Sequence, residues 1–406
     1  MSRFLLTSLL LIFASYYTFA QVLTHEDSLS AGLIRSNNVT VISGYGQAKV
    51  QYDFRAKTAV ANLTRNVLFL GHKFNDKIYF FSEMELENAK VTNGNPSGEI
   101  SMEQLFLKFN LNRDLYLQAG LFIPRMGIIN ENHLPTTFNG NDRTYVETFV
   151  IPSTWREIGV GLYGNLRSIP GLNYSFAVVN GLNSSTFVNG SGIAEGKQEG
   201  SNATASNLAV TGSLLYYLKN WRLQASAYYG GSAGLIKRVA DSLQLKSGPF
   251  GTPVSLVEAN AQYHNNGISF RALATMVKIP DAFAINRAYA NNTPSMMVGY
   301  YAELGYDLFR LLETRSTKTF VVFAREEFLD LNYRIPANGI RNGINVKNYT
   351  VLGFTFRPVS GVVVKADYVL RRTDERNEDL IVTPFPQQLP YYTSNGFFNL
   401  GIGYSF

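Results

Sequence analysis

The sequence predicts an all-β protein, built as one antiparallel β-barrel of about 16 strands that closes on itself. Three observations support this class. Apolar and polar residues alternate with a period of two through most of the chain from residue 39 onward. Short turns alternate with long polar loops, and the 28 Phe and 24 Tyr residues often lie beside the turns. Alternation places unlike side chains on the two faces of a strand.

Residues 78–91, IYFFSEMELENAKV, show the alternation most clearly. Met84 and Leu86 fall on one face of an extended chain, and three acidic residues fall on the other. These acidic residues are Glu83, Glu85 and Glu87. A helix would spread the glutamates around its circumference, whereas a strand aligns them in one polar row. The same pattern recurs at residues 105–111, 115–123, 158–163, 362–371 and 398–406.

The order of strands and connections follows from this pattern. The predicted strands are residues 39–54, 59–74, 78–91, 100–111, 115–123, 154–166, 172–182, 207–218, 221–231, 253–263, 268–279, 297–308, 318–329, 346–356, 361–372 and 396–406. The predicted long loops are residues 92–99, 124–153, 183–207, 232–252, 280–295, 330–345 and 373–395. The register of residues 320–329 is ambiguous.

The first 20 residues predict an export signal. Arg3 precedes an apolar run, and the segment ends in Thr18-Phe19-Ala20, so we expect a signal peptide cleaved after Ala20. The alternative is a membrane anchor, but the run is shorter than the about 20 residues that a helical span needs. No later stretch has 18 consecutive apolar residues. We therefore divide the chain into a signal peptide (1–20), an N-terminal periplasmic segment (21–38) and a barrel (39–406).

Composition excludes several classes of function. The formal net charge is +6, with both signs spread along the chain, which is too weak and dispersed to predict nucleic-acid binding. The chain has no Cys, so it has no disulfide framework and no metal-thiolate site. We expect no cofactor and no metal. No linker, repeat or change of composition divides the mature chain into domains.

Alternation alone does not say which face meets water. In a soluble β-sandwich the apolar face would form the core, whereas in a membrane barrel it would face lipid. The export signal, the terminal Phe406 and aromatic pairs beside the turns favour the barrel, with the pairs at the membrane interfaces. Long loops at one end and short turns at the other also fit an outer-membrane barrel of a Gram-negative bacterium.

Residues 124–153 form a long segment that is rich in charge. So long a loop would be unusual inside a compact soluble domain, but a wide barrel could hold it folded inward, narrowing the bore. The predicted pore-constriction residues are Arg125, Glu131, Asp142, Arg143 and Glu147. The predicted lumen-wall residues are Glu83, Glu85, Glu87, Lys108, Lys365, Asp367 and Arg371. Charges of both signs in a pore act on passing ions. The alternative is that these charges pair with each other and pin the loop.

One stretch resembles a known family. It reads DRTYVE at residues 142–147 and IPSTWREIG at residues 151–159, and Pro124 and Pro135 precede it. This stretch is similar to the inward-folded third loop and following strand of the porin O and P-like family of outer-membrane channels. The resemblance implies a homotrimer of 16-stranded barrels that passes small solutes by diffusion. It also implies that Trp155, Arg156 and Glu157 anchor the loop.

Two further expectations follow from the resemblance. The end of the chain, residues 396–406, resembles the signal by which the barrel-assembly machinery recognises a terminal aromatic residue, here Phe406. An outer-membrane barrel would also contact lipopolysaccharide. Phosphate selectivity in the family depends on a ladder of basic residues in the lumen. The inward rows here mix acidic and basic residues, so phosphate selectivity is not inferred.

Catalytic motifs in the chain lack the context that they need. Residues 230–234 match the pattern G-x-S-x-G, but we expect a turn there, with no following helix and no nearby base. Gly159, Gly161 and Gly164 match a dinucleotide-binding pattern but lie within a predicted strand. The four histidines show no metal-ligand spacing. We therefore predict a porin and no enzyme. The alternative is a barrel that binds or adheres through its long loops at residues 183–207 and 232–252.

Overall fold

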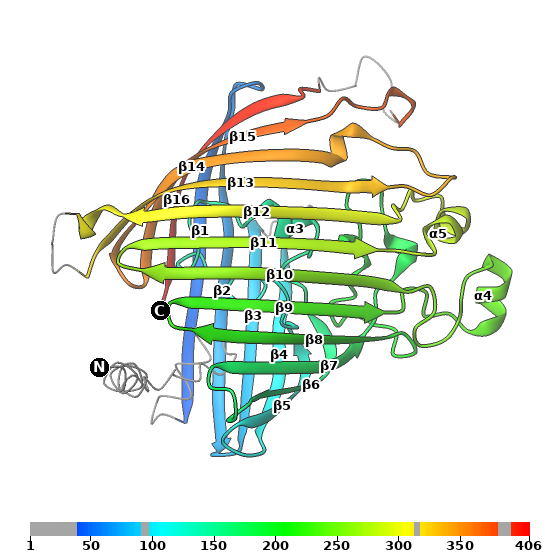
Figure 1. Ribbon diagram of the computed structural model, residues 1–406, viewed down its shortest axis with the longest axis horizontal. Coiled ribbons are helices and arrows are strands. Elements are labelled where there is room, and N and C mark those ends of the chain that lie inside the picture. Colours follow the sequence, from blue (N-terminus) through cyan, green and yellow to red (C-terminus); the bar gives the residue numbers. More distant parts are fainter. Residues whose placement is uncertain (1–38, 91–96, 312–316, 381–390) are drawn as a thin grey trace, which may run out of the picture.

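The computed structural model describes residues 39–90, 97–311, 317–380 and 391–406. These residues form one closed antiparallel barrel of sixteen strands, in which each strand pairs with its neighbours in the chain and β1 pairs with β16 (Figure 1). The expected signal peptide (1–20) and periplasmic segment (21–38) lie outside the described residues.

The strands agree closely with the prediction. They are β1 (Thr40–Asp53), β2 (Thr58–Asn75), β3 (Ile78–Lys90), β4 (Ser97–Asn110), β5 (Leu115–Phe122), β6 (Glu157–Asn165), β7 (Leu172–Asn180), β8 (Leu208–Leu218), β9 (Trp221–Gly230), β10 (Val254–Asn265), β11 (Ile268–Lys278), β12 (Met296–Asp307), β13 (Thr319–Arg334), β14 (Val346–Val359), β15 (Val362–Thr373) and β16 (Ser394–Ser405). The strand β6 begins three residues later than expected, and β13 extends five residues beyond its predicted end.

The long loops contain short helices that the alternation did not predict. These are α3 (Tyr145–Phe149), α4 (Lys237–Leu243) and α5 (Ala282–Tyr289), with 3-10 helices at Ser184–Thr186, Ala194–Gly196, Gly343–Asn345 and Glu378–Leu380. A further 3-10 helix, Leu308–Arg310, follows β12 directly. Figure 1 shows α4 and α5 beyond the strand ends at one end of the barrel, and the C-terminus at the other. No helix among the described residues is long and apolar enough to cross a membrane.

The exposure of side chains shows which way each face points. On β16, Leu400 and Ile402 are 48% and 59% exposed on the outer face, whereas Asn399, on the inner face, is fully buried. A soluble sandwich would bury the aliphatic row, so the outer surface of this barrel is its apolar side.

The inner face is less polar than predicted. Phe69, Phe81 and Leu256 belong to the inner rows and are buried with Met126 and Ile128 from the connection between β5 and β6. The polar face that was predicted to point inward is therefore interrupted by apolar residues. These three inner positions are apolar because they bury apolar side chains of the connection.

Candidate functional site

The connection between β5 and β6 contacts strands on the far side of the barrel. Its two ends meet, since Phe122 pairs with Glu157 across the two strands. Residues in the middle of the connection form hydrogen bonds with inner-row residues of other strands. These strands lie about half the barrel's circumference away. Those bonds run from Asn139 Nδ2 to Glu303 on β12 (3.0 Å), from the Val146 amide to Glu327 on β13 (2.9 Å) and from the Asn141 amide to Asp367 on β15 (2.7 Å).

Glu147 on α3 joins two parts of this connection to each other and to the barrel wall. One carboxylate oxygen accepts hydrogen bonds from the amides of Ile128 and Ile129, both at 2.7 Å. The other accepts from the Tyr301 hydroxyl on β12 at 2.6 Å. Glu147 is fully buried, and burial raises its pKa above the ordinary value. Gly127 (φ +71°) lies beside it, and a Cβ there would come within 2.5 Å of the carboxylate.

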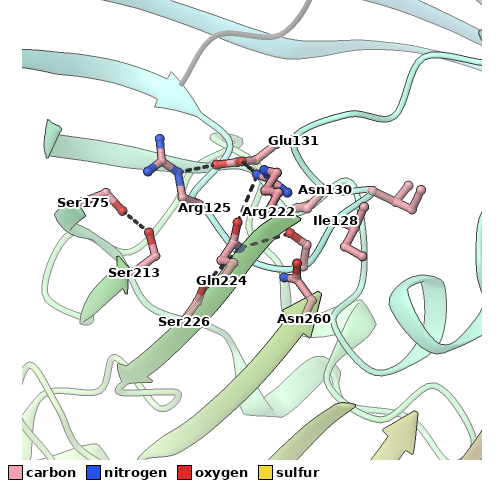
Figure 2. Close-up of polar contacts among 12 residues, drawn as sticks. Arg125, Ile128, Asn130, Glu131, Ser175, Ser213, Arg222, Gln224, Ser226 and Asn260 are labelled. Carbon is pink, nitrogen blue, oxygen red and sulfur yellow. Dashed lines mark hydrogen bonds and ion pairs between the residues drawn. The ribbon is translucent and has the colours of Figure 1, made fainter. Parts of the chain in front are cut away.

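Two more of the predicted constriction residues form a buried network with the wall (Figure 2). Arg125 Nε lies 3.0 Å from Glu131 Oε1, and Arg222 on β9 lies 3.2 Å from Glu131 Oε2. Gln224, also on β9, donates to the Gly127 carbonyl. Arg125 and Glu131 are both at most 5% exposed. Their contacts fit the alternative role, in which paired charges pin the loop.

Asp142 and Arg143 occupy a different place, beside a cavity of about 420 Å³. The cavity lies between residues 142–156 and the inner faces of β2, β3 and β4, with residues of the 183–207 loop at its edge. The basic side chains that line it are Arg65, Arg143, Arg156 and Lys197. The acidic ones are Glu85, Glu87, Glu99, Asp142 and Glu199. The lining therefore mixes both signs, with one more acidic than basic group.

Most of these charges have partners across the cavity wall. Arg65 lies 3.4 Å from Glu85 and 3.6 Å from Glu87. Arg156 and Lys197 both pair with Glu199, at 2.9 and 2.8 Å. Outside the cavity lining, Lys49 on β1 pairs with Asp142. Burial, together with Arg65 nearby, lowers the pKa of Arg143 to about 10.

The predicted lumen-wall residues divide into two groups. Glu85 and Glu87 line the cavity, whereas the others contact neighbouring wall residues or the connection itself. Lys365 lies over the Phe138 ring at 3.8 Å, and Lys108 over the Tyr116 ring at 4.1 Å. In addition, Asp367 accepts two hydrogen bonds from Asn141, Arg371 lies over the Phe397 ring and Glu83 accepts from Gln104.

The three predicted anchoring residues lie at the end of the connection. Trp155 is fully buried, its indole donates to Glu157 at 2.8 Å, and its amide donates to Asn130 at 2.7 Å. Because the Trp155 amide bonds to Asn130 and not to a neighbouring strand, Trp155 is not part of the sheet, and β6 begins at Glu157. Arg156 contacts Glu199 and also lines the cavity.

Four charged residues of the cavity lining were missed by the sequence analysis: Arg65, Glu99, Lys197 and Glu199. Arg65 could have been found, because it lies in the inner row of β2 directly opposite Glu87. Lys197 and Glu199 come from a loop, and the alternation of apolar and polar residues does not predict where loop side chains lie.

The motif at residues 230–234 has a structural role. A helix, α4, does follow it, against expectation, but the Ser232 hydroxyl donates to the Thr252 carbonyl at 2.6 Å and is fully buried. Among the described residues, no hydrogen bond joins a serine to a histidine. Gly159, Gly161 and Gly164 lie within β6, as predicted.

The barrel is similar to solved outer-membrane structures. These include OmpF of Salmonella typhi in complex with daunomycin (TM-score 0.55, 11% identity, 90% of this chain and 97% of that one). They also include an anion-selective porin from Comamonas acidovorans (TM-score 0.53, 9%, 90% and 99%) and the channel DcaP of Acinetobacter baumannii (TM-score 0.51, 13%, 90% and 97%). Identities this low show a shared fold, that of outer-membrane porins and channels.

Sequence comparison adds one relative of unknown role. An uncharacterized protein of Aquifex aeolicus (strain VF5) is 27% identical over 354 residues, which span 84% of this chain and 77% of the relative. No protein-family model matches the chain. The resemblance to the porin O and P-like family stays a prediction.

Proposed function

We propose that this chain is an outer-membrane porin that lets small hydrophilic solutes and ions cross by passive diffusion. The observation that carries the proposal is a closed barrel with an exposed apolar outer face and a charged cavity inside. The outer face suits lipid, and the cavity suits hydrated solutes. The export signal predicted at residues 1–20 would deliver the chain to the outer membrane of a Gram-negative bacterium.

In this proposal residues 124–153 fold into the barrel and narrow its bore. Their hydrogen-bond partners Glu303, Glu327 and Asp367 are buried inner-row residues, so a path over the outer surface would not reach them. The cavity beside Asp142 and Arg143 is then the candidate passage. Arg125, Glu131 and Glu147 fix the loop in place and do not face the solute.

Mixed charges in the lining favour weak selectivity. Because acidic groups exceed basic ones by one, we expect a slight preference for cations. We also propose a homotrimer in contact with lipopolysaccharide, assembled through recognition of Phe406. A trimer form is described for one similar structure, OmpT of Vibrio cholerae, at a TM-score of 0.50.

Planar-bilayer recording tests the proposal. The full mature chain, refolded in detergent, should give ohmic conductance steps, and liposomes that contain it should swell in small sugars but not in large ones. Unfolded chain from the same preparation is the control. A barrel that inserts but stays silent would contradict the proposal and favour a binding role for the loops at residues 183–207 and 232–252.

A further inference from the structure

Three buried side chains from three parts of the chain converge inside the barrel. Glu83 lies on β3, Glu103 on β4 and His133 on the connection between β5 and β6. One potential ligand atom from each lies within 4.8 Å of the other two, and all three residues are at most 1% exposed. A histidine nitrogen and two carboxylate oxygens are a ligand set that suits Zn²⁺ and similar divalent ions.

Each of these side chains is oriented by a partner on its far side. His133 Nδ1 lies 3.1 Å from the Asn130 carbonyl, which accepts the Nδ1 proton and leaves Nε2 facing the glutamates. Glu103 Oε2 accepts from the Tyr45 hydroxyl at 2.7 Å. Glu83 Oε2 accepts from Gln104 at 2.8 Å. Metal-ligating histidines and carboxylates are typically held by outer partners in this way.

His133 Nε2 and Glu103 Oε1 lie too far apart for a hydrogen bond. They are 3.6 Å from each other, and within the described part of the chain neither atom has a hydrogen-bond partner. A hydrogen bond there would need a separation of about 2.7–3.2 Å. Two ligands on one tetrahedral Zn²⁺, each about 2.1 Å from the ion, are roughly 3.4 Å apart.

The charge around the cluster also favours a cation. Glu85 lies within electrostatic range of Glu103, which brings a third buried carboxylate to the group. Two guanidinium groups, those of Arg65 and Arg143, interact with Glu103. A bound divalent ion would supply positive charge to buried carboxylates, whose charge is costly to bury without a counter-charge.

We propose that Glu83, Glu103 and His133 bind one divalent transition-metal ion, with Zn²⁺ as the best-fitting probe. The ion would cross-link the connection that carries His133 to the wall formed by β3 and β4. It would act as a structural latch, because its ligands are buried and come from three separate parts of the chain. Mg²⁺ and Ca²⁺ fit poorly, since they prefer six or more oxygen ligands.

The test uses untagged full-length mature chain, treated with chelator while unfolded and refolded in detergent with Zn²⁺. After gel filtration, elemental analysis should find about one Zn²⁺ per wild-type chain. Glu103→Gln and His133→Gln should each lower this content at least tenfold. The matched controls are Glu99→Gln, an acidic residue of the cavity, and His264→Gln, an exposed histidine near the end of β10. Both controls should keep the ion.

Two results would overturn the proposal. One is a wild-type chain that retains no Zn²⁺, and the other is Glu103→Gln protein that retains as much as wild type. If either cluster variant fails to refold, X-ray absorption of Zn²⁺-loaded wild type decides. Scattering from one imidazole with oxygen ligands at about 2.0–2.2 Å supports the site, and its absence refutes it.

Discussion

Replacing Glu147 by Ala should loosen the connection between β5 and β6 without opening the barrel. The change removes the acceptor of two backbone N–H groups, those of Ile128 and Ile129, in a site with no exposure. A buried donor left without a partner costs about 1–3 kcal/mol, so the two together cost about 2–6 kcal/mol. The sixteen-strand ladder makes no use of Glu147 and should stay intact.

Hydrogen exchange measured by mass spectrometry reads this loss directly. A local cost of about 2 kcal/mol corresponds to a fall of about 30-fold in the protection of peptides that contain Ile128 and Ile129. Glu147→Gln is the matched control, because its amide oxygen can still accept from both N–H groups, and it should lose much less protection. Unchanged protection in the Ala variant would refute the role assigned to Glu147.

Three other substitutions probe the cavity and the outer face. Neutralising Glu87 with Gln should shift the K⁺/Cl⁻ permeability ratio toward anions and Arg143→Gln should shift it toward cations, each by up to about fivefold at low salt, since one charge at about 4 Å in water contributes about 1 kcal/mol. Asp76→Asn, at an exposed turn, is the control. The same K⁺/Cl⁻ permeability ratio in all variants would show that Glu87 and Arg143 do not face the path of the ions. Leu400→Arg on the outer face should lower the free energy of unfolding in lipid vesicles by about 2–4 kcal/mol, as measured by urea titration. Leu400→Ala should cost less, and an Arg variant as stable as wild type would show that this face does not meet lipid.

The barrel could be predicted from sequence because its strands are exposed to different surroundings on their two faces. Strand β13 shows where this signal weakens. Arg325, Glu326 and Glu327 are consecutive, and Glu326 is exposed on the outer face while its neighbours are buried on the inner one. With charge on both faces the alternation no longer identifies the inner row, which left the register of residues 320–329 ambiguous.

The candidate site was predicted less completely. Residue type and spacing do not distinguish a charge that faces a passage from one that is buried in an ion pair. Arg125 and Arg143 belong to one connection, yet Arg125 is paired with Glu131 whereas Arg143 lines the cavity. The difference depends on which strands the connection reaches across the barrel. Those contacts join residues far apart in the chain, and local sequence patterns do not encode them.

Removing residues 124–153 shows whether they narrow a water-filled barrel. Phe122 and Glu157 already pair across β5 and β6, so a short Asn-Gly turn can replace residues 124–155 and close the hairpin. Refolding would be checked by circular dichroism. If residues 124–153 narrow the barrel, the variant should show a single-channel conductance several-fold above wild type and pass larger sugars into liposomes. A folded, inserted variant with unchanged conductance and unchanged size limit would contradict this narrowing.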